Sequence, residues 1–405
     1  MNFYCAGFHV IVGAANARGK KQKTKLHIQG GAMSYLNEDQ ELMLDAVREF
    51  AQTELRPRVL TELERDIFPY DLLDRMKELG LPLMAMPEEY GGLGESMVAH
   101  VAIEKEVAKE NMTMALIGTN CVVASLIVRM GTQEQKDRYL PDLLETPGGF
   151  AFTEPAAGSD ASGIEATAVK DGDEWVINGQ KTFISFINQA NYFLISARTN
   201  ETGDGGISAF LVPKDTPGLK LGSIFHKLGL RGSDTGELFF EDVRVPAIAM
   251  IGKENKGLHA ALSLLDEARL GVASCAVGLA EAALEKSVEY VKGRVAFGRP
   301  LATKQGLQWY AAEMETKISA ARALLFEVAN DYDEGRSITV GAAKAKLFAT
   351  SVAVEVTDRA IQMCGGYGLI EDYGVERLYR DARTCAIIEG TDEILKIVVS
   401  RQVLS

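Results

Sequence analysis

The sequence predicts an α+β multidomain protein with an N-terminal helical domain, a central antiparallel β-domain and a C-terminal four-helix-type bundle. Apolar residues recur at helical spacing in the first part, short β-rich runs alternate with turn signals in the middle, and long helical patterns return at the end. A chain of 405 residues has room for two or three domains. The expected boundaries are 1–32 for a flexible extension, 33–147 for the N-terminal helical domain, 148–252 for the β-domain and 253–405 for the helical bundle.

The first predicted helix begins after Asn37, which can act as an N-cap because Gln40 follows three residues later. Apolar residues from Leu42 to Leu55 repeat every three to four positions, as on the buried face of an amphipathic helix. Pro57 is expected to end this segment. Further helical patterns continue to about residue 145.

The central region is expected to form short strands, because β-branched and aromatic residues cluster there between turn signals. Asp171-Gly172-Asp173 and Asn178-Gly179 are two of these turns. The strands are too short and the turns too frequent for βαβ units, and no strand–GxGxxG–helix pattern supports a Rossmann fold. The predicted strands are 164–170, 174–178, 192–197 and 207–212.

The last region contains helical patterns longer than the average globular helix of about 11–12 residues. Long antiparallel helices with short connections are typical of bundles. Gly365-Gly366 is expected to interrupt the third of these helices, and a final helix is expected to begin near Thr391 or Asp392. The predicted long helices cover 258–292, 304–332 and 340–363.

Composition excludes several classes of function. Hydrophobic residues make up 47% and charged residues 24% of the chain, as in an ordinary globular protein. The net charge of −13 argues against nucleic-acid binding, although local arginines and helix N-termini can still bind phosphates. No apolar run approaches the length of a membrane helix, so no membrane insertion is predicted.

The five cysteines are scattered and form no CxxC pair, so neither a metal site nor a disulfide framework is expected. Free buried thiols suit a reducing compartment, which predicts a cytoplasmic protein. In residues 1–32 the basic residues follow the apolar run, which is the wrong order for a secretory signal. If this extension is instead a transit segment, the expected location is the mitochondrial matrix.

Two stretches near the β-domain have the residues to hold a flat ligand. The stretch from Phe150 to Asp160 combines aromatic rings, small residues and the hydroxyls of Thr153 and Ser159. Phe183 and Ser185, two residues apart on a strand, suit a ring stacked on an isoalloxazine with a hydrogen bond to its edge. Taken alone, the plainer interpretations are a polar turn and a strand with one core phenylalanine.

Two stretches of the helical region are further candidates. Arg294 and Phe297, at a break between helices and followed by Gln305, can clamp a pyrophosphate and an adenine. The stretch from Gln362 to Gly368 contains three glycines, which fit a helix end opened for a ligand. The plainer interpretations are a solvated arginine beside a core phenylalanine, and an ordinary helix C-cap.

Glu389 is the candidate catalytic residue. It follows the apolar run 384–388 and precedes Thr391, a plausible N-cap for the last helix. A carboxylate among apolar residues is desolvated and its pKa is raised, which suits a general base near neutral pH. Taken alone, Glu389 is more ordinary as a solvated acid that leads into a helix.

Seven stretches, in this order, resemble the acyl-CoA dehydrogenase family from about Asn37 to Ser405. Agreement of all of them by chance is implausible. They are the Pro87 to Gly94 loop, the TEPxxGSD stretch from Thr153, the run from Asn178 to Lys181, the run from Leu228 to Thr235, the RxxFG segment from Arg294, the QxxGGxG segment from Gln362 with Arg380-Asp381, and the EGT segment from Glu389.

The resemblance implies that FAD lies between the β-domain and the bundle, within a homotetramer built as a dimer of dimers. Arg294, Gln305 and Gln362 to Gly366 would reach the FAD of a neighbouring subunit. Ser159, Asp266, Arg269 and Gly390 would touch the acyl-CoA. All the implied cofactor contacts are Phe150, Phe152, Thr153, Ser159, Phe183, Ile184, Ser185, Arg294, Phe297, Gln305, Gln362, Gly365, Gly366, Thr391 and Glu393.

By the same resemblance, Glu389 takes the α-proton while a hydride leaves the β-carbon for flavin N5, giving a trans-2-enoyl-CoA. Electrons would pass to an electron-transfer flavoprotein. Some branches place the base just before Arg269; Ala268 stands there in this chain, which favours Glu389. The chain departs from common family residues at Phe183, where tryptophan is frequent, and at Ile388, where tyrosine is common.

Two alternatives remain open from the sequence. An acyl-CoA oxidase shares the chemistry but uses O2 as its electron acceptor. A non-catalytic binding or assembly relative on the same fold would be expected to lose the base or the flavin contacts. The acyl chain is not identified: a dicarboxylyl substrate would require a buried cation, and Arg129, the only candidate, is expected at the surface.

Overall fold

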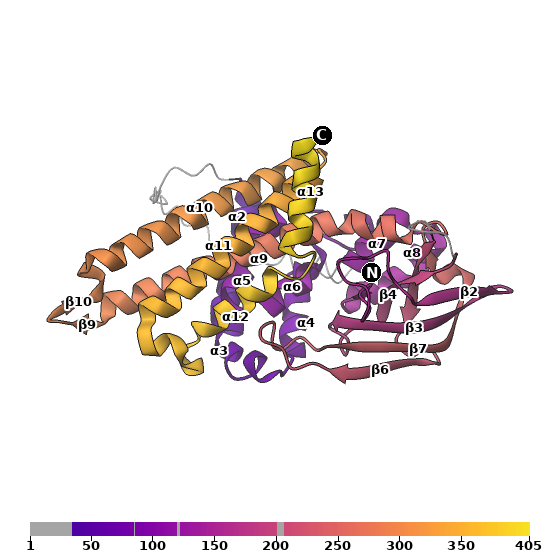
Figure 1. The fold of residues 1–405 in the computed structure, drawn as a ribbon, viewed down its shortest axis with the longest axis horizontal. Coiled ribbons are helices and arrows are strands. Elements are labelled where there is room, and N and C mark those ends of the chain that lie inside the picture. The colour runs from indigo at the N-terminus through magenta and orange to yellow at the C-terminus, as the bar shows by residue number, and fades with distance from the viewer. Residues whose placement is uncertain (1–34, 85, 120–121, 201–205) are drawn as a thin grey trace, which may run out of the picture.

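The computed structural model describes residues 35–84, 86–119, 122–200 and 206–405. A set of helices, a β-sheet and a bundle of long helices follow one another along the chain (Figure 1). This order confirms the predicted fold class. The predicted extension, residues 1–32, lies outside the described residues.

The N-terminal part contains α2 (Glu38–Phe50), α3 (Arg56–Val59), α4 (Tyr70–Glu78), α5 (Met97–Glu110), α6 (Met112–Thr119), α7 (Val122–Met130) and α8 (Gln133–Glu145). The predicted capping box is present, because Asn37 and Gln40 exchange hydrogen bonds between side chain and backbone. The expectation that Pro57 ends the helix is wrong. The chain continues through a π turn, Ala51–Leu55, and Pro57 lies in the first turn of α3, where a missing N–H is tolerated.

One stretch of this part, Met112–Met130, is long and apolar enough by composition to cross a membrane, with a mean hydropathy of 1.6. The expectation that no such run exists is therefore wrong. The stretch comprises α6, α7 and the undescribed residues 120 and 121, and 71% of its apolar window is buried inside the fold. Its burial is that of a core segment, in which Met114 and Ile127 are fully enclosed.

The sheet consists of β1 (Gly149–Ala151), β2 (Thr167–Asp171), β3 (Glu174–Ser185), β4 (Tyr192–Arg198), β5 (Ile207–Pro213), β6 (Leu219–Ile224), β7 (Thr235–Pro246) and β8 (Met250–Ile251). The strand order is β6-β7-β3-β2-β4-β5-β8, with β1 beside β4. Most pairs are antiparallel as predicted, but β1 and β2 pair with β4 in parallel, so the sheet is mixed. The predicted strands correspond to β2 to β5, and β3 runs past its predicted end to Ser185.

The C-terminal part contains α9 (Gly257–Gly293), α10 (Gln305–Asp333), α11 (Thr339–Cys364), α12 (Glu376–Cys385) and α13 (Asp392–Leu404). The three long helices agree closely with the predicted ones, and α13 begins at Asp392 as expected. The short helix α12 was not predicted. It packs on both α9 and α11 and leads into the turn that carries Glu389.

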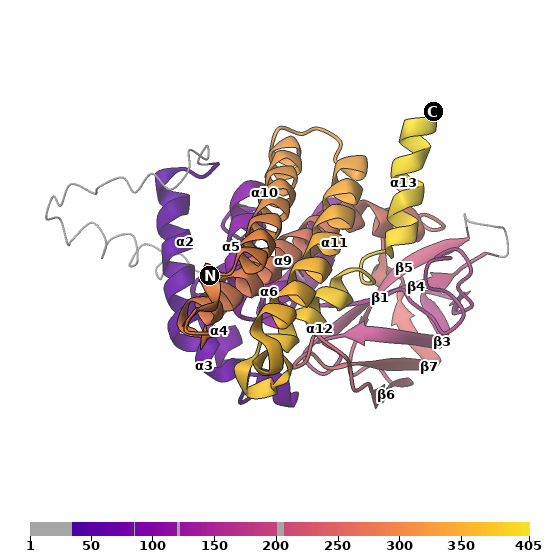
Figure 2. The ribbon, with the colours of Figure 1, turned by 60° about the vertical axis from the view of Figure 1, so that its left-hand side comes forward.

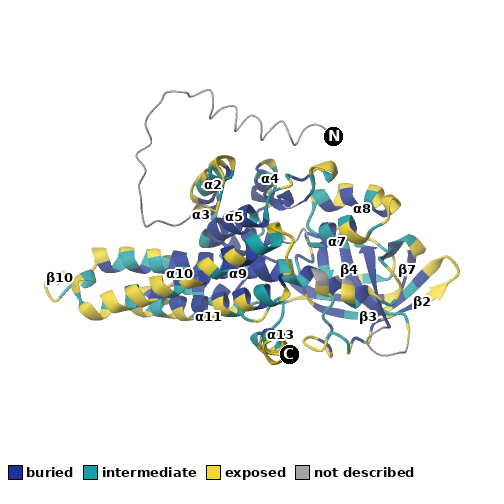
Figure 3. Ribbon diagram, turned by 90° about the horizontal axis from the view of Figure 1, so that it is seen from above, coloured by how far each residue is buried: buried dark blue, intermediate teal, exposed yellow. Residues whose placement is uncertain are grey.

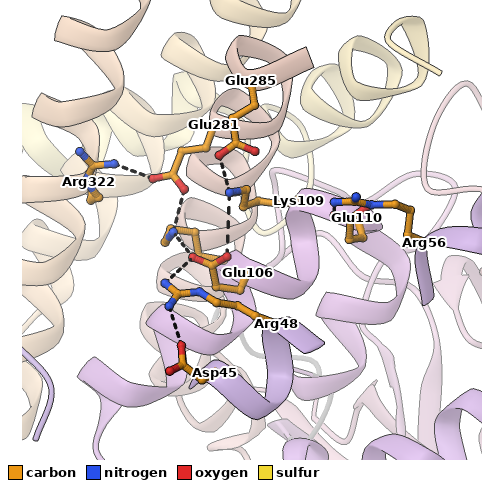
Figure 4. Close-up of polar contacts among 10 residues, drawn as sticks. Asp45, Arg48, Arg56, Glu106, Lys109, Glu110, Glu281, Glu285 and Arg322 are labelled. Atoms are coloured by element: carbon orange, nitrogen blue, oxygen red, sulfur yellow. Dashed lines mark hydrogen bonds and ion pairs between the residues drawn. The ribbon is translucent and has the colours of Figure 1, made fainter. Parts of the chain in front are cut away.

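The N-terminal helices and the bundle share one hydrophobic core. In Figure 2, α5 and α9 lie between α2 on one side and α11 on the other, and Figure 3 shows the buried residues concentrated along α5 and the middle of α9. Charged groups also join the two parts (Figure 4): buried Lys105 on α5 pairs with Glu281 on α9 at 2.7 Å, and Glu281 pairs with Arg322 on α10.

Candidate active site

The turn between α12 and α13 holds Glu389 in an unusual backbone conformation. The φ angle is 53° at Glu389 and 96° at Gly390. A positive φ is uncommon for a residue with a Cβ, and such strain persists only where the surroundings hold it. The Glu389 residue is half-buried, and Ile388 before it packs against the main helical core.

Two cations from neighbouring helices hold this turn. The Nε of Arg269, on α9, donates to the Glu389 carbonyl at 3.4 Å, and the Nζ of Lys346, on α11, donates to the Gly390 carbonyl at 2.6 Å. Arg269 also pairs with Asp266 at 3.0 Å. The structure thus brings Glu389 together with three of the predicted substrate residues, Asp266, Arg269 and Gly390.

Lys346 was not singled out from the sequence. Its side chain is charged yet 0% exposed, and it lies on the inward side of α11 with Ala342, Ala349 and Ala353. The sequence did contain a signal for its burial. The alanines recur at helical spacing, and a lysine at the same spacing is expected to face the core.

Burial raises the pKa of Glu389 above its ordinary value, and the charges of Lys346 and Arg269 oppose the rise. Burial also lowers the pKa of Lys346 to about 8, while the charge of Asp392 favours its ammonium form. The direction for Glu389 agrees with the one predicted from its apolar surroundings. A carboxylate of this kind can act as a general base near neutral pH.

Glu267, an acid on α9 beside the alternative base position, already interacts with other side chains. It pairs with Arg129, and the Tyr332 hydroxyl donates to it at 3.0 Å. Arg129 is exposed, in agreement with its expected surface position. Ala268, the alternative base position, is buried and has no titratable group. Neither of these two positions therefore competes with Glu389 as the candidate base.

A buried ion pair joins the two predicted ligand-binding stretches of the β-domain. The Nζ of Lys181 lies 2.6 Å from Glu154 Oε1 and also donates to the Phe152 carbonyl and the Ser196 hydroxyl. Glu154 in turn accepts the backbone N–H of Glu165 at 2.6 Å. Because Lys181 is on β3 and Glu154 lies after β1, the pair fixes one stretch against the other.

Main-chain and aromatic contacts reinforce the same junction. The N–H of Thr182 donates to the Thr153 carbonyl at 2.9 Å. Phe150 and Phe152 stack with ring centroids 4.4 Å apart and pack against the core shared by α7, α8 and the sheet. Phe150, Phe152 and Thr153 are all half-buried, whereas Ser159 is exposed, so the Ser159 hydroxyl is the most accessible of these groups.

Phe183 lies at a β-bulge in β3. The pairing with β7 shifts register between Lys181 and Ile184, and Phe183 has a φ of 58°. A bulge re-aims side chains, and 65% of Phe183 is exposed, with the Phe225 ring 5.4 Å away. Ile184 packs in the sheet core, which leaves only its main chain for a ligand, while Ser185 is half-buried. The regular strand assumed for this stretch is therefore wrong.

The remaining cofactor candidates of the bundle gather at its end away from the sheet, around the hairpin of β9 (Val295–Ala296) and β10 (Arg299–Pro300) (Figure 1). Phe297, at the hairpin tip, is 93% exposed. A Cβ built on Gly365 or Gly366 would meet no atom within 4 Å. Within one chain, the cofactor candidates of the bundle therefore lie away from Phe183. These candidates are Arg294, Phe297, Gln305, Gln362, Gly365 and Gly366.

Thr391 and Glu393 lie beside the Glu389 turn. Thr391 takes the N-cap position of α13 with extended backbone, as predicted, but its side chain makes no capping hydrogen bond. Hydrogen bonds from the Glu393 N–H and the Thr391 side chain lower the pKa of exposed Glu393. Between them, Asp392 has a buried Oδ1 without a hydrogen-bond partner among the described residues.

These features fit a flavin dinucleotide. An exposed aromatic ring at Phe183 and hydroxyls at Ser185 and Ser159 suit a flat heterocycle with a polar arm, and the open glycines at Gly365-Gly366 suit close approach of a ligand. In the described part of the chain, no group of three His, Cys, Asp or Glu side chains is arranged to hold a metal ion.

Comparison with known proteins gives matches along almost the whole described chain. The family models match as the N-terminal domain (residues 37–146), middle domain (149–243) and C-terminal domain (255–404) of acyl-CoA dehydrogenase. The chain is 43% identical to an acryloyl-CoA reductase (NADH) of Anaerotignum propionicum, covering 91% of this chain and 95% of that one.

Two solved structures show the same architecture. Butyryl-CoA dehydrogenase from Megasphaera elsdenii is 38% identical with a TM-score of 0.89, covering 92% of this chain and 100% of that one. A chain in a structure of the electron transferring flavoprotein of Acidaminococcus fermentans is 40% identical with a TM-score of 0.89, at the same coverage.

Proposed function

The chain belongs to the acyl-CoA dehydrogenase family, and we propose that it oxidises an acyl-CoA thioester to a trans-2-enoyl-CoA with Glu389 as the base. The observation that carries this assignment is the half-buried Glu389 carboxylate, with its raised pKa, on a turn fixed by Arg269 and Lys346. FAD, when bound, supplies the acceptor for the β-hydride.

Glu389 offers two groups to the substrate. The α-proton of a thioester is weakly acidic, so its removal requires a positioned base and a donor for the oxygen on which charge develops. Among the described residues, no group accepts a hydrogen bond from the Glu389 N–H, which leaves it available to the thioester oxygen. Because carboxylate and N–H belong to one residue, fixing the turn fixes both.

Two chains are proposed to complete each cofactor site. Phe183, Ser185 and Thr153 would hold the FAD of their own chain, while the hairpin around Phe297 and the Gly365-Gly366 segment would reach the FAD of a neighbour. The exposed aromatic ring of Phe297 supports this, because a second chain that packed on the hairpin would remove this hydrophobic side chain from water. The full assembly proposed is a homotetramer.

The proposed electron acceptor is an electron-transfer flavoprotein. The likeness to a chain from such a structure in Acidaminococcus fermentans supports this partner. A cytoplasmic location is proposed with it, since Cys275, Cys364 and Cys385 are free and buried, as suits a reducing compartment. A dicarboxylyl substrate is not favoured, because Arg129 is exposed and paired with Glu267.

The reverse reaction, reduction of an enoyl-CoA, is a second candidate. It is favoured by the 43% identity to the acryloyl-CoA reductase of Anaerotignum propionicum. The same site serves both directions, because a base that removes the α-proton becomes the acid that returns it. Incubating the FAD-bound protein with acyl-CoA or enoyl-CoA, each with the matching electron partner, separates the two directions. Rapid reoxidation by O2 alone would instead identify an oxidase.

The decisive experiment compares Glu389→Gln with wild type in anaerobic flavin bleaching by acyl-CoA. The variant should retain FAD and bind acyl-CoA, yet reduce the flavin at least about 100-fold more slowly, since general-base catalysis contributes that much. Glu267→Gln is the matched control, because Glu267 is an acid of α9 already paired with Arg129. A rate of flavin reduction close to that of wild type in Glu389→Gln would contradict the proposal.

A further inference from the structure

Lys346 holds the proposed catalytic turn but carries out no step of the proposed reaction itself. Its ammonium group is fully buried and donates to the Gly390 carbonyl at 2.6 Å. Burial of an ammonium group is unfavourable unless it is paired and hydrogen-bonded. An apolar side chain at the same place on α11 would pack in the core without that penalty, so the charge itself requires an explanation.

The contacts of Lys346 supply that explanation. Together with Arg269, it holds two successive carbonyls of the turn, those of Glu389 and Gly390, from two different helices. Both residues of the turn have positive φ, a conformation that needs external support at a residue other than glycine. Lys346 provides the shorter of the two hydrogen bonds.

We infer that Lys346 is a positioning residue of the dehydrogenation site, which holds the Gly390 carbonyl and so fixes the direction of the Glu389 carboxylate and N–H. The inference rests on the proposed function, because a positioned base has meaning only if Glu389 is the base. It goes further by assigning a role to a residue on α11 that donates to the Gly390 carbonyl of the turn.

The charge of Lys346 has a second effect on the same carboxylate. The groups whose charges act on Lys346 are Asp392, Cys385, Glu389 and Arg269. The two cations that act on Glu389 are Lys346 and Arg269, and both oppose the effect of burial on its pKa. Without Lys346, only Arg269 would oppose burial, so the pKa of Glu389 would rise. The pH at which the base becomes ionised would move upward.

Two variants separate positioning from charge. Lys346→Met removes both the hydrogen bond and the charge while keeping an unbranched side chain. Lys346→Gln keeps a neutral donor and carries the test if the methionine variant does not fold. Lys105→Met is the matched control, because Lys105 is also a buried lysine, but it is paired with Glu281 between α5 and α9, away from the turn.

Each FAD-bound protein is assayed by anaerobic flavin bleaching at saturating butyryl-CoA from pH 6 to pH 9. We expect flavin reduction at pH 7 to slow by about tenfold or more in Lys346→Met, since small misplacement of a base is costly. The rate profile of both Lys346 variants should move to higher pH. Lys105→Met should keep the wild-type profile even where it lowers thermal stability.

Hydrogen exchange gives a readout independent of turnover. Amides of residues 387–394 should exchange faster in Lys346→Met than in wild type or Lys105→Met. Wild-type rate, pH profile and exchange in a folded Lys346 variant would overturn the inference. That result is distinguishable from failure of the proposed function, which would appear as active Glu389→Gln.

Discussion

Replacing Lys181 with methionine tests whether its buried pair with Glu154 holds the cofactor junction together. Lys181 is 0% exposed and donates to Glu154, to the Phe152 carbonyl and to the Ser196 hydroxyl. In Lys181→Met the Glu154 carboxylate would keep only two backbone N–H donors, at 2.6 Å and 3.2 Å. A buried charge would thus remain without its cation.

Removing one partner of a buried ion pair costs about 3–5 kcal/mol of the free energy of unfolding. Because two backbone N–H groups still donate to the Glu154 carboxylate, we expect Lys181→Met to lose stability near the lower end of this range, about 3 kcal/mol. Loosening of the junction should also weaken FAD binding about tenfold, which corresponds to about 1.4 kcal/mol. Urea unfolding followed by circular dichroism measures the first quantity, and equilibrium dialysis of FAD measures the second.

The double variant Lys181→Met/Glu154→Leu is the internal control. If the orphaned carboxylate causes the loss, removing it as well should restore part of the stability, because the two substitutions are coupled. Equal unfolding free energies and equal FAD affinities for Lys181→Met and wild type would refute the reasoning. A double variant less stable than the sum of the single variants would also contradict it.

Two further predictions concern pH and assembly. Asp381 accepts the Leu230 N–H at 2.7 Å, and burial raises its pKa from 3.8 to about 6. Because the folded protein holds this proton more tightly, the contribution of Asp381 to the free energy of unfolding falls as pH rises from about 4 to about 6. Asp381→Asn should lack this fall in urea unfolding at pH 4, 5 and 6, and equal slopes would contradict the assignment. Phe297→Ser should change monomer stability by less than about 0.5 kcal/mol, since the ring is exposed, yet weaken subunit association in sedimentation velocity. An unchanged assembly would remove the hairpin from the interface.

Periodicity alone was enough to predict most of the helical architecture. The long helices α9, α10 and α11 have continuous apolar faces, and the capping signal at Asn37 and Gln40 is local in sequence. Such features depend on neighbours within a few residues, which is why they can be read without a structure. Pro57 misled the prediction because a π turn before it kept the chain helical.

The site was harder to predict because its geometry depends on contacts between distant segments. Sequence indicated Glu389, but not that Lys346 and Arg269 hold its turn from two helices. The regular alternation of side chains predicted along β3 is wrong at Phe183, because the bulge there depends on pairing with β7, a strand far along the chain. The resemblance implied a cofactor contact at Ile184, and the sequence did not show that its side chain packs in the sheet core and leaves its main chain for such a contact.

The shared core of the N-terminal helices and the bundle has a consequence for biosynthesis. The partner of α5 (Met97–Glu110) is α9 (Gly257–Gly293), and the whole β-sheet is translated between them. The sheet has a hydrophobic core of its own, so it can fold before α9 has been translated and can pack on α5. The side of α5 that packs on α9 therefore stays uncovered for much of translation, and we expect this interval to be where the nascent chain depends most on chaperones.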